Sequence, residues 1–320
     1  MNPARRLFAA ACLALAATAA LAQPYPARPI RFIVPNPPGG GTDLLSRLVA
    51  SRLGEANRWQ IVVDNRPGAG GNIGLEQAAK SPADGYTIAM GETSNLAINP
   101  TLYARLPYDP ARDLAPVMLV GSVPLVLVVA PARPFVSLPA LTGAAKSGSL
   151  SFASAGNGTV GHLVGEIFKR VAGVSLLHVP YKGAAPAMTD LMGGQVDLFF
   201  ASLPAAVAHI KSGKLRALAV TSARRAQALP ELPTLAESGF GELVASPWYG
   251  IVAPAGIPAD IVLLLNAELN RLLQQPDLQA RLASDGVEAV GGTPAAFAAF
   301  MAAERERWSR AVRDSGARID

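Results

Sequence analysis

The spacing of hydrophobic and polar residues along the chain predicts short strands that are followed by helices. Apolar side chains occupy every second position at Ile30, Phe32 and Val34, which is typical of a strand, and residues 35–41 interrupt this pattern with prolines and glycines. The next apolar residues recur at helical spacing, at Leu44, Leu45, Leu48, Val49 and Leu53. This segment therefore predicts a strand, a glycine-rich loop and a helix, in that order.

The same order recurs through most of the sequence. A second unit is predicted from a strand at 149–153, a polar loop at 154–161 and a helix at 162–171. Other segments have the apolar pattern of strands, at 61–63, 86–90, 117–129, 176–179, 196–200, 215–221 and 248–253. Other helices are predicted at 185–192, 261–273 and 294–313. Strands that alternate with helices favour an α/β fold in which each mainly parallel sheet is flanked by helices.

The order of the units predicts a discontinuous domain. The C-terminal helices follow a returning strand, so we interpret the second unit as an insertion within the first. The first domain then comprises residues 23–122 and 252–320, and residues 123–251 form the second domain together with the crossings between the two.

The N-terminus has the three parts of a Sec-type secretory signal. Arg5 and Arg6 are followed by an apolar run at 7–17, and small residues precede a cleavage site that we expect after Ala22. A membrane anchor is disfavoured because the run is shorter than the roughly 20 residues that a spanning helix needs. We therefore expect residues 1–22 to be a signal peptide and the mature protein to be periplasmic.

Composition and charge exclude several classes of protein. The chain is 50% hydrophobic and 16% charged, which is too apolar for a disordered protein. Loss of Arg5 and Arg6 lowers the formal net charge from +5 to +3, and the remaining basic residues are scattered, so no nucleic-acid partner is expected. Cys12 is the single cysteine and leaves with the signal, which excludes thiolate chemistry. The histidines lack metal-ligand spacing and neighbouring carboxylates, so we expect no metal and no cofactor.

The first glycine-rich loop has the features of an anion site. Its candidate ligand-binding residues are Asn36, Pro38, Gly39, Gly40, Gly41, Thr42 and Asp43. Glycines let the backbone approach a ligand closely, and the helix that follows has unpaired N–H groups at its N-terminus. Thr42 is a candidate N-cap residue. The alternative, a tight turn with an ordinary cap and no ligand, remains open at this point.

The second loop combines glycines with side-chain donors. Its candidate residues are Ser154, Gly156, Asn157, Gly158, Thr159 and, in the first turn of the next helix, His162. The three glycines at 156, 158 and 161 have the spacing of a dinucleotide-binding loop, but the acidic residue expected about 20 positions later is missing. We therefore reject a nucleotide ligand and keep the interpretation of an anion-binding loop.

Several motifs in the same order resemble a known family from residue 25 to residue 317. They include Pro38-Gly39-Gly40-x-x-Asp43, Asn65-Arg66-Pro67-Gly68-Ala69-Gly70-Gly71, Ser154-x-Gly156-x-Gly158-Thr159-x-x-His162, Val179-Pro180-Tyr181-Lys182-Gly183, Gly194-Gln195-Val196-Asp197 and Trp248-Tyr249-Gly250. The sequence resembles the Bug-type extracytoplasmic solute receptors, which are the substrate-binding components of tripartite tricarboxylate transporters. The resemblance implies a two-lobed periplasmic binding protein, type II-like, that closes on its ligand as a Venus flytrap.

The resemblance also implies a ligand and a site. The ligand would be a small organic carboxylate, such as a di- or tricarboxylate, an amino acid or an aromatic acid, and the partners would be membrane permease subunits. A monomer is expected. Further candidate residues are Gly71, Asn72, Thr93, Ser94, Asn95, Tyr181 and Asp197. Asp197 could bind a ligand ammonium or cap local backbone, and we favour the second role. Asn36 departs from the aromatic residue that many relatives have at this position.

Two other functions are weighed against transport. The closed form could engage a signalling protein, which would make the chain a sensor. A periplasmic hydrolase that uses Ser154 and His162 is the less favoured alternative, and we expect a binding protein rather than an enzyme.

Overall fold

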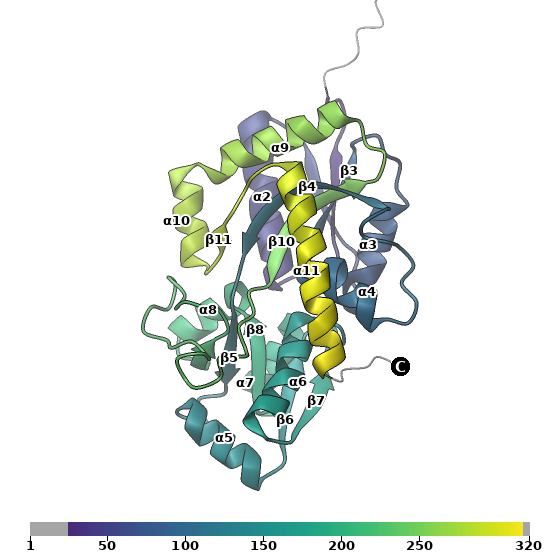
Figure 1. Ribbon diagram of the computed structural model, residues 1–320. Coiled ribbons are helices and arrows are strands. Elements are labelled where there is room, and N and C mark those ends of the chain that lie inside the picture. The colour runs from purple at the N-terminus through teal and green to yellow at the C-terminus, as the bar shows by residue number, and fades with distance from the viewer. Residues whose placement is uncertain (1–24, 316–320) are drawn as a thin grey trace, which may run out of the picture.

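The computed structural model describes residues 25–315 and contains two β-sheets, one above the other in the view of Figure 1. The first sheet has the strand order β11-β4-β10-β3-β1-β2, and the second has the order β7-β6-β8-β5-β9. The first is built from β1 (Ile30–Val34), β2 (Ile61–Asn65), β3 (Thr87–Glu92), β4 (Leu114–Ser122), β10 (Trp248–Pro254) and β11 (Glu288–Ala289). The second is built from β5 (Leu125–Val129), β6 (Leu150–Ser154), β7 (Leu176–Pro180), β8 (Leu198–Ser202) and β9 (Arg216–Val220). The expected signal peptide, its cleavage site and Cys12 lie outside the described residues.

Both sheets are mixed, where the sequence predicted mainly parallel sheets. Strands β2 and β3 run parallel to β1, and β7 and β8 run parallel to β6. By contrast, β10 pairs antiparallel with β3 and β4, and β5 pairs antiparallel with β8 and β9. Strand β11 also pairs antiparallel with β4. The stretch predicted as one strand at 117–129 is divided between β4 and β5 at the first crossing. The two-lobed α/β class is confirmed, and β10, β11 and β5 are the strands that run against the others of their sheets.

Helices cover the faces of both sheets. Around the first sheet lie α2 (Gly41–Asn57), α3 (Asn72–Ala79), α4 (Asn99–Leu102), α9 (Ala259–Leu273), α10 (Pro276–Ser284) and α11 (Pro294–Ser315). Around the second lie α5 (Leu138–Ser147), α6 (Val160–Ala172), α7 (Ala184–Met192) and α8 (Leu203–Lys211). The pattern did not predict α4, α5, α8 or α10, which are short and have a proline in the first turn. Proline is tolerated there because the first N–H groups of a helix have no partner.

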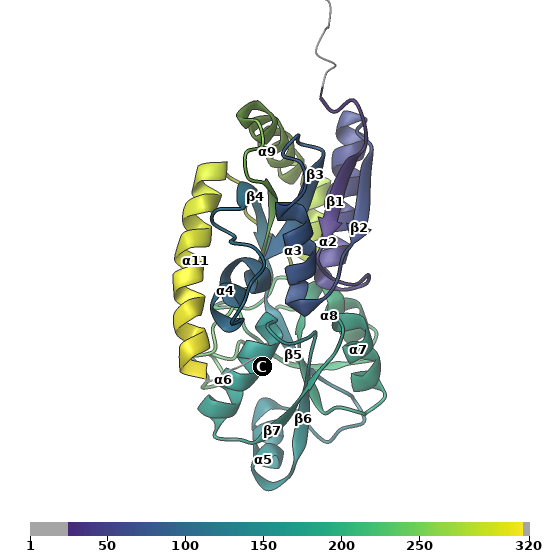
Figure 2. The ribbon, with the colours of Figure 1, turned by 90° about the vertical axis from the view of Figure 1, so that its right-hand side faces the viewer.

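The C-terminal helix α11 runs along both lobes and contacts α6 of the second (Figure 2). Its apolar stripe of Phe297, Met301, Trp308 and Val312 is buried, as core packing requires. The carboxylate of Glu304 accepts hydrogen bonds from the indole N–H groups of Trp248 and Trp308, both at 2.9 Å. This contact fixes α11 to the first residue of β10, where the chain has just returned from the second lobe. Among residues 25–315, no helix has the length and the apolar character needed to cross a bilayer.

Candidate functional site

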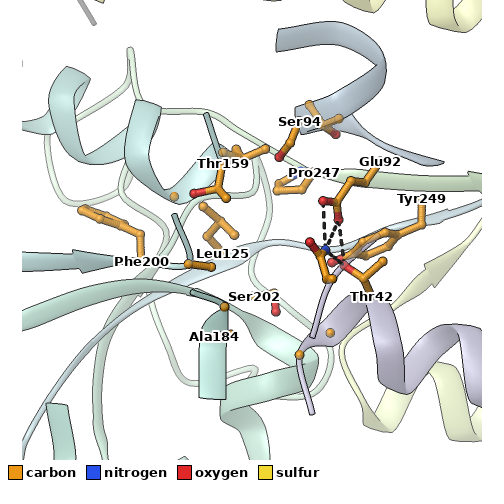
Figure 3. Close-up of a pocket in the computed structure, with 18 of the residues that line it drawn as sticks. Thr42, Glu92, Ser94, Leu125, Thr159, Ala184, Phe200, Ser202, Pro247 and Tyr249 are labelled. Carbon is orange, nitrogen blue, oxygen red and sulfur yellow. Dashed lines mark hydrogen bonds between the residues drawn. The ribbon is translucent and has the colours of Figure 1, made fainter. Parts of the chain in front are cut away.

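A small cavity of about 80 Å³ lies where the two lobes meet (Figure 3). Residues of both lobes line it: Asn36, Pro37, Gly40, Gly41, Thr42, Glu92, Thr93, Ser94, Pro247 and Tyr249 on the first side, and Leu125, Ala155, Thr159, Val160, Gly161, Gly183, Ala184, Phe199, Phe200 and Ser202 on the second. A wider cavity of about 680 Å³ shares Asn36, Pro37, Ala155, Thr159 and Gly183 with it, and is also lined by Tyr103, residues 67–71, 156–157 and 180–182. A ligand in this region would touch both lobes.

Helix N-termini converge on the small cavity. Its lining includes Gly41, Val160 and Ala184, which are the first residues of α2, α6 and α7, and Ser202, which precedes α8. Within residues 25–315, no protein group accepts a hydrogen bond from the backbone N–H of Gly41, Val160 or Ala184. Unpaired N–H groups and the positive ends of helix dipoles attract anions without any Lys or Arg.

The first loop binds a carboxylate of the protein itself. The N-cap position of α2 is Gly40, which has no side chain, so the prediction that Thr42 caps this helix is wrong. The Thr42 hydroxyl instead donates to Glu92 Oε2 at 2.7 Å. The Asn36 amide donates to Glu92 Oε1 at 3.0 Å and to Thr42 Oγ1 at 2.7 Å. These three side chains form one hydrogen-bonded group at the wall of the cavity (Figure 3).

Glu92 is the last residue of β3 and is only 8% exposed. Burial raises the pKa of its carboxyl group, and the hydrogen bonds from Thr42 and Asn36 oppose part of that effect. Tyr249 lies opposite Glu92 in the β3–β10 pairing and lines the same cavity. The first side of the cavity is therefore acidic.

Asp43 lies behind the loop and does not line either cavity. It accepts a hydrogen bond from the backbone N–H of Gly39 at 3.0 Å and pairs with Arg47 and Asn65. Burial alone would raise the pKa of its carboxyl, but Arg47, the Gly39 N–H and Asn65 together lower it. Asp43 thus holds the loop in shape as a charged residue whose partners are already in place.

The second loop presents hydroxyl groups over a pair of histidines. Thr159 is the N-cap residue of α6; its Oγ1 accepts from the His162 N–H at 3.4 Å and donates to Gly156 O at 2.8 Å. The rings of His162 and His178 stack with centroids 4.2 Å apart. Burial, followed by the nearby charges of His162 and Lys169, lowers the pKa of His178 to about 4. Both rings are therefore neutral near pH 7.

The fold corrects one expectation about these histidines. The sequence showed no carboxylate beside them, but Glu166 lies one helical turn after His162, and ligand atoms of Glu166, His162 and His178 lie within 4.8 Å of one another. Each of these groups already has a protein partner, because Lys169 pairs with Glu166, Ser154 Oγ lies 2.7 Å from His178 Nε2, and the Gly158 N–H reaches His162 Nδ1. The cluster therefore supports the loop from behind.

Each glycine loop closely approaches the opposite lobe, α2 of the first loop at the end of β8 and the second loop at the start of α4. A Cβ atom at Gly41 would lie 2.6 Å from Ser202 Oγ, and one at Gly158 would lie 2.6 Å from Asn99 Oδ1. In both pairs the second atom belongs to the opposite lobe. Closure to this distance needs a glycine at these two positions, and Gly158 also has a φ of +79°.

The structure brings together part of the predicted site. Predicted residues that line the small cavity are Asn36, Gly40, Gly41, Thr42, Thr93, Ser94 and Thr159. Those that line the wider cavity are Asn36, Gly71, Gly156, Asn157, Thr159 and Tyr181. Those that line neither are Pro38, Gly39, Asp43, Asn72, Asn95, Ser154, Gly158, His162 and Asp197.

The predicted residues outside the cavities have structural partners. Asn95 Oδ1 accepts from the Glu92 N–H at 3.0 Å, and Asn72 Oδ1 accepts from Asn99 at 2.8 Å. Asp197 accepts from the backbone N–H of Ser151 at 2.8 Å and forms an ion pair with Arg133, which is the capping role that the sequence favoured. Asp197 does not line the cleft, so a ligand ammonium does not reach it here.

Sequence reasoning missed Glu92, Ser202 and Tyr249. Glu92 follows an apolar strand, and its charge at the end of that strand was the one signal that could have marked it. Tyr249 belongs to the motif Trp248-Tyr249-Gly250, which marked the resemblance but gave no site role, and Ser202 ends β8, where no local motif marks it. Phe199, Phe200, Leu125 and Pro247 supply the apolar wall and have the appearance of core residues in the sequence.

Comparisons with known proteins agree with this geometry. The family model described as "Tripartite tricarboxylate transporter family receptor" matches residues 45–317. Protein BugT of Bordetella pertussis is 43% identical over 311 residues, which are 95% of each chain. The structure of R. palustris Rpa4515 with adipate has a TM-score of 0.90 and 38% identity, and covers 92% of this chain and 100% of its own. MatC of Rhodopseudomonas palustris with bound malate has a TM-score of 0.84 and 29% identity, and covers 90% and 100%.

Proposed function

We propose that this chain, which belongs to the tripartite tricarboxylate transporter receptor family, captures a small organic anion that bears a carboxylate. The ligand would lie in the cleft between the lobes, with its carboxylate on backbone N–H groups of both loops. The observation that carries this proposal is the convergence of the N-termini of α2, α6 and α7 on one cavity lined from both lobes.

Energetics support a site of this kind. A hydrogen bond to a charged group contributes about 1.5–3 kcal/mol, so four to six of them, less the cost of association, reach the roughly −8 kcal/mol of micromolar binding. Ser94 and Ser202 add hydroxyl groups around the backbone donors. The solved relatives named above hold adipate and malate, which are both dicarboxylates.

We infer that binding serves transport. The family is one of receptors and not of enzymes, and delivery of the ligand to membrane permease subunits follows from its name. The mature chain would act as a monomer in the periplasm after cleavage behind Ala22. Residues 23–122 and 252–320 would form one lobe, and residues 123–251 the other lobe and the crossings. A hydrolase built on Ser154 is not supported, because Ser154 is fully buried and its hydroxyl meets His178 rather than His162.

A ligand screen tests the proposal. Thermal unfolding of the mature protein would be followed with succinate, malate, adipate, citrate, aspartate, glutamate and benzoate, because a ligand that binds only the folded state raises Tm. Positive ligands would be measured by calorimetry against Gly158→Val, whose side chain would collide with Asn99 of the opposite lobe and hold the lobes apart. The proposal predicts a Tm increase with at least one carboxylate and its loss in the variant. No response to any carboxylate would overturn it.

A further inference from the structure

The negative charge of Glu92 opposes the binding of an anion in the small cavity. Its carboxyl group lines the same small cavity on which the helix N-termini converge, and it is 8% exposed. A ligand carboxylate placed next to it would meet a like charge in surroundings with little water. The cavity therefore needs something that compensates Glu92 before a second carboxylate can enter.

The protein supplies only neutral donors to Glu92. Asn36 Nδ2 lies 3.0 and 3.1 Å from its two oxygens, and Thr42 Oγ1 lies 2.7 Å from Oε2. Within residues 25–315, no Lys, Arg or His nitrogen comes within 4.0 Å of either oxygen. An ionised carboxylate offers about four acceptor positions, so it still has capacity for a further donor.

The surroundings favour a cation as that donor. Burial without a counter-ion disfavours the charged carboxylate and raises its pKa, so the group gains from a positive partner. Two ionisable neighbours, Tyr249 and Tyr108, have pKa values that burial and the charge of Glu92 raise, so both stay neutral near pH 7. A positive partner for the Glu92 carboxylate therefore has to come from the ligand, or a proton has to neutralise the carboxylate.

The positions of the groups favour the ligand. In Figure 3, Glu92 lies with Thr42 and Tyr249 on one side of the cavity, and Thr159 lies on the other side, at the N-terminus of α6. Cationic and anionic ends of one small molecule would then face groups of opposite character. Thr159 bears no charge, and the histidines behind it are neutral near pH 7, so the second side accepts an anion without repulsion.

We propose that Glu92 is a specificity-determining residue that pairs with a protonated amino group of the ligand, so that the receptor selects small zwitterionic amino acids over plain dicarboxylates. Asn36 and Thr42 position the Glu92 carboxylate, and the N-termini of α6 and α7 hold the ligand carboxylate. The inference rests on the proposed function and narrows its ligand class.

Matched ligand pairs test this inference. Calorimetry at neutral pH would compare aspartate with succinate and 2-aminoadipate with adipate, since each pair differs by one amino group. We expect the better pair to show a preference on the order of 10- to 100-fold for the amino member, which is what one charge-assisted hydrogen bond supplies. Glu92→Gln should abolish that preference and retain binding of the plain dicarboxylate. The control is Glu55→Gln, an exposed residue of α2 whose carboxylate bonds only Ser51, and it should keep the preference.

The outcomes separate the two proposals. Tighter binding of succinate or adipate by the unmodified protein, or an amino preference that survives Glu92→Gln, overturns the role of Glu92 and leaves the carboxylate receptor intact. Affinity for a plain dicarboxylate that rises steadily as pH falls also overturns it, because a protonated Glu92 would then be the donor. If no carboxylate of either kind binds, the proposed function itself fails.

A second variant keeps the test valid if Glu92→Gln does not fold. Glu92→Asp retains the charge but withdraws it by one methylene group, so the amino preference should shrink without reversing. An unchanged preference in Glu92→Asp contradicts the proposed contact. Circular dichroism of each variant checks the fold before affinities are compared.

Discussion

The two loops that meet at the cleft share one architecture and differ in their electrostatics. Each follows a parallel strand, contains glycines and leads into a helix whose N-terminus lines the cavity. The first loop surrounds two carboxylates of the protein, those of Glu92 and Asp43, whereas the second carries Thr159 over the neutral pair of His162 and His178. Repetition of a local motif therefore does not imply repetition of its chemistry.

This difference makes the two sides of the cleft electrostatically unequal. Much of the positive potential of the α2 N-terminus is offset by protein carboxylates, and that of the α6 N-terminus is available to a ligand. A symmetrical dicarboxylate would use both ends equally, but these two sides are unequal. The predictions below test that inequality.

The largest effect is expected where the two sides touch. A Cβ atom in Gly41→Ala would overlap Ser202 Oγ at 2.6 Å and hold the lobes apart, which should weaken ligand binding by about 10- to 100-fold. Gly40→Ala should lose much less affinity, because the nearest atom to its Cβ is 3.8 Å away. Calorimetry with the ligand found in the screen measures both. Gly143→Ala, inside α5 with open space around it, is the control, and equal losses in all three variants would refute closure as the cause.

Opposite pH dependences should distinguish the two sides. The folded pKa of His178 is about 4, below its ordinary value of 6.5, so its contribution to stability is present above that ordinary value and is lost as pH falls towards 4. The folded pKa of Glu92 is raised, so the ligand-free protein loses stability as pH rises through it. His178→Gln should therefore flatten the acid side of the Tm profile. Glu92→Gln should raise Tm more at about pH 8 than at about pH 5. Differential scanning calorimetry across this range would measure Tm against pH for both variants. If the change in Tm relative to the unmodified protein varies with pH in the same direction in both, the comparison is wrong.

Removal of the second-loop cap should have a moderate effect on stability. Thr159→Val deletes the oxygen that accepts from the His162 N–H, and an N-cap of this type contributes about 1 kcal/mol. Denaturant unfolding would measure the loss, together with a weaker affinity because the α6 N-terminus frays. Thr142→Val, at a half-buried position of α5 far from the cavity, serves as the control. A loss confined to affinity would mean that Thr159 binds the ligand and does not cap the helix.

The smallest expected signal is optical. Trp248 begins β10 at the return crossing, and its indole N–H bonds to Glu304 of α11, so movement of the lobes should change its emission. Fluorescence titration with the ligand should show a change that is reduced in Trp248→Phe. An undiminished change in the variant would assign it to Trp59 or Trp308 instead.

Local patterns predicted the framework of this molecule well. The alternation at 30–34 and the glycine loops at 35–41 and 154–161 were sufficient to place two strand–loop–helix units and to predict an anion site between them. These features depend on neighbours in the sequence, because a strand period and a helix N-terminus are local properties. The buried stripe of α11 was predictable for the same reason.

Local sequence patterns could not predict the acidic side of the cavity. Glu92 becomes part of the cavity only because β3 lies between β1 and β10, and Asn36 and Thr42 reach it across the loop. The polar residues predicted at 72 and 95 instead support this arrangement from behind, since Tyr108 donates to Asn95 O at 2.7 Å and to Asn72 Oδ1 at 3.2 Å. Nonlocal contacts thus decided which polar residues face the cavity. The departure at Asn36 now has a physical reason, because an aromatic side chain there would leave Glu92 without that donor.

A crystal structure of the mature protein with the tightest acid from the screen tests the central claim most directly. The claim predicts a ligand carboxylate with oxygens about 3 Å from backbone N–H groups at the start of α6 and α7, in the cavity between the lobes. The result that would contradict it is a carboxylate held in the wider cavity by the Lys182 side chain, with the N–H groups of Val160 and Ala184 facing no ligand atom.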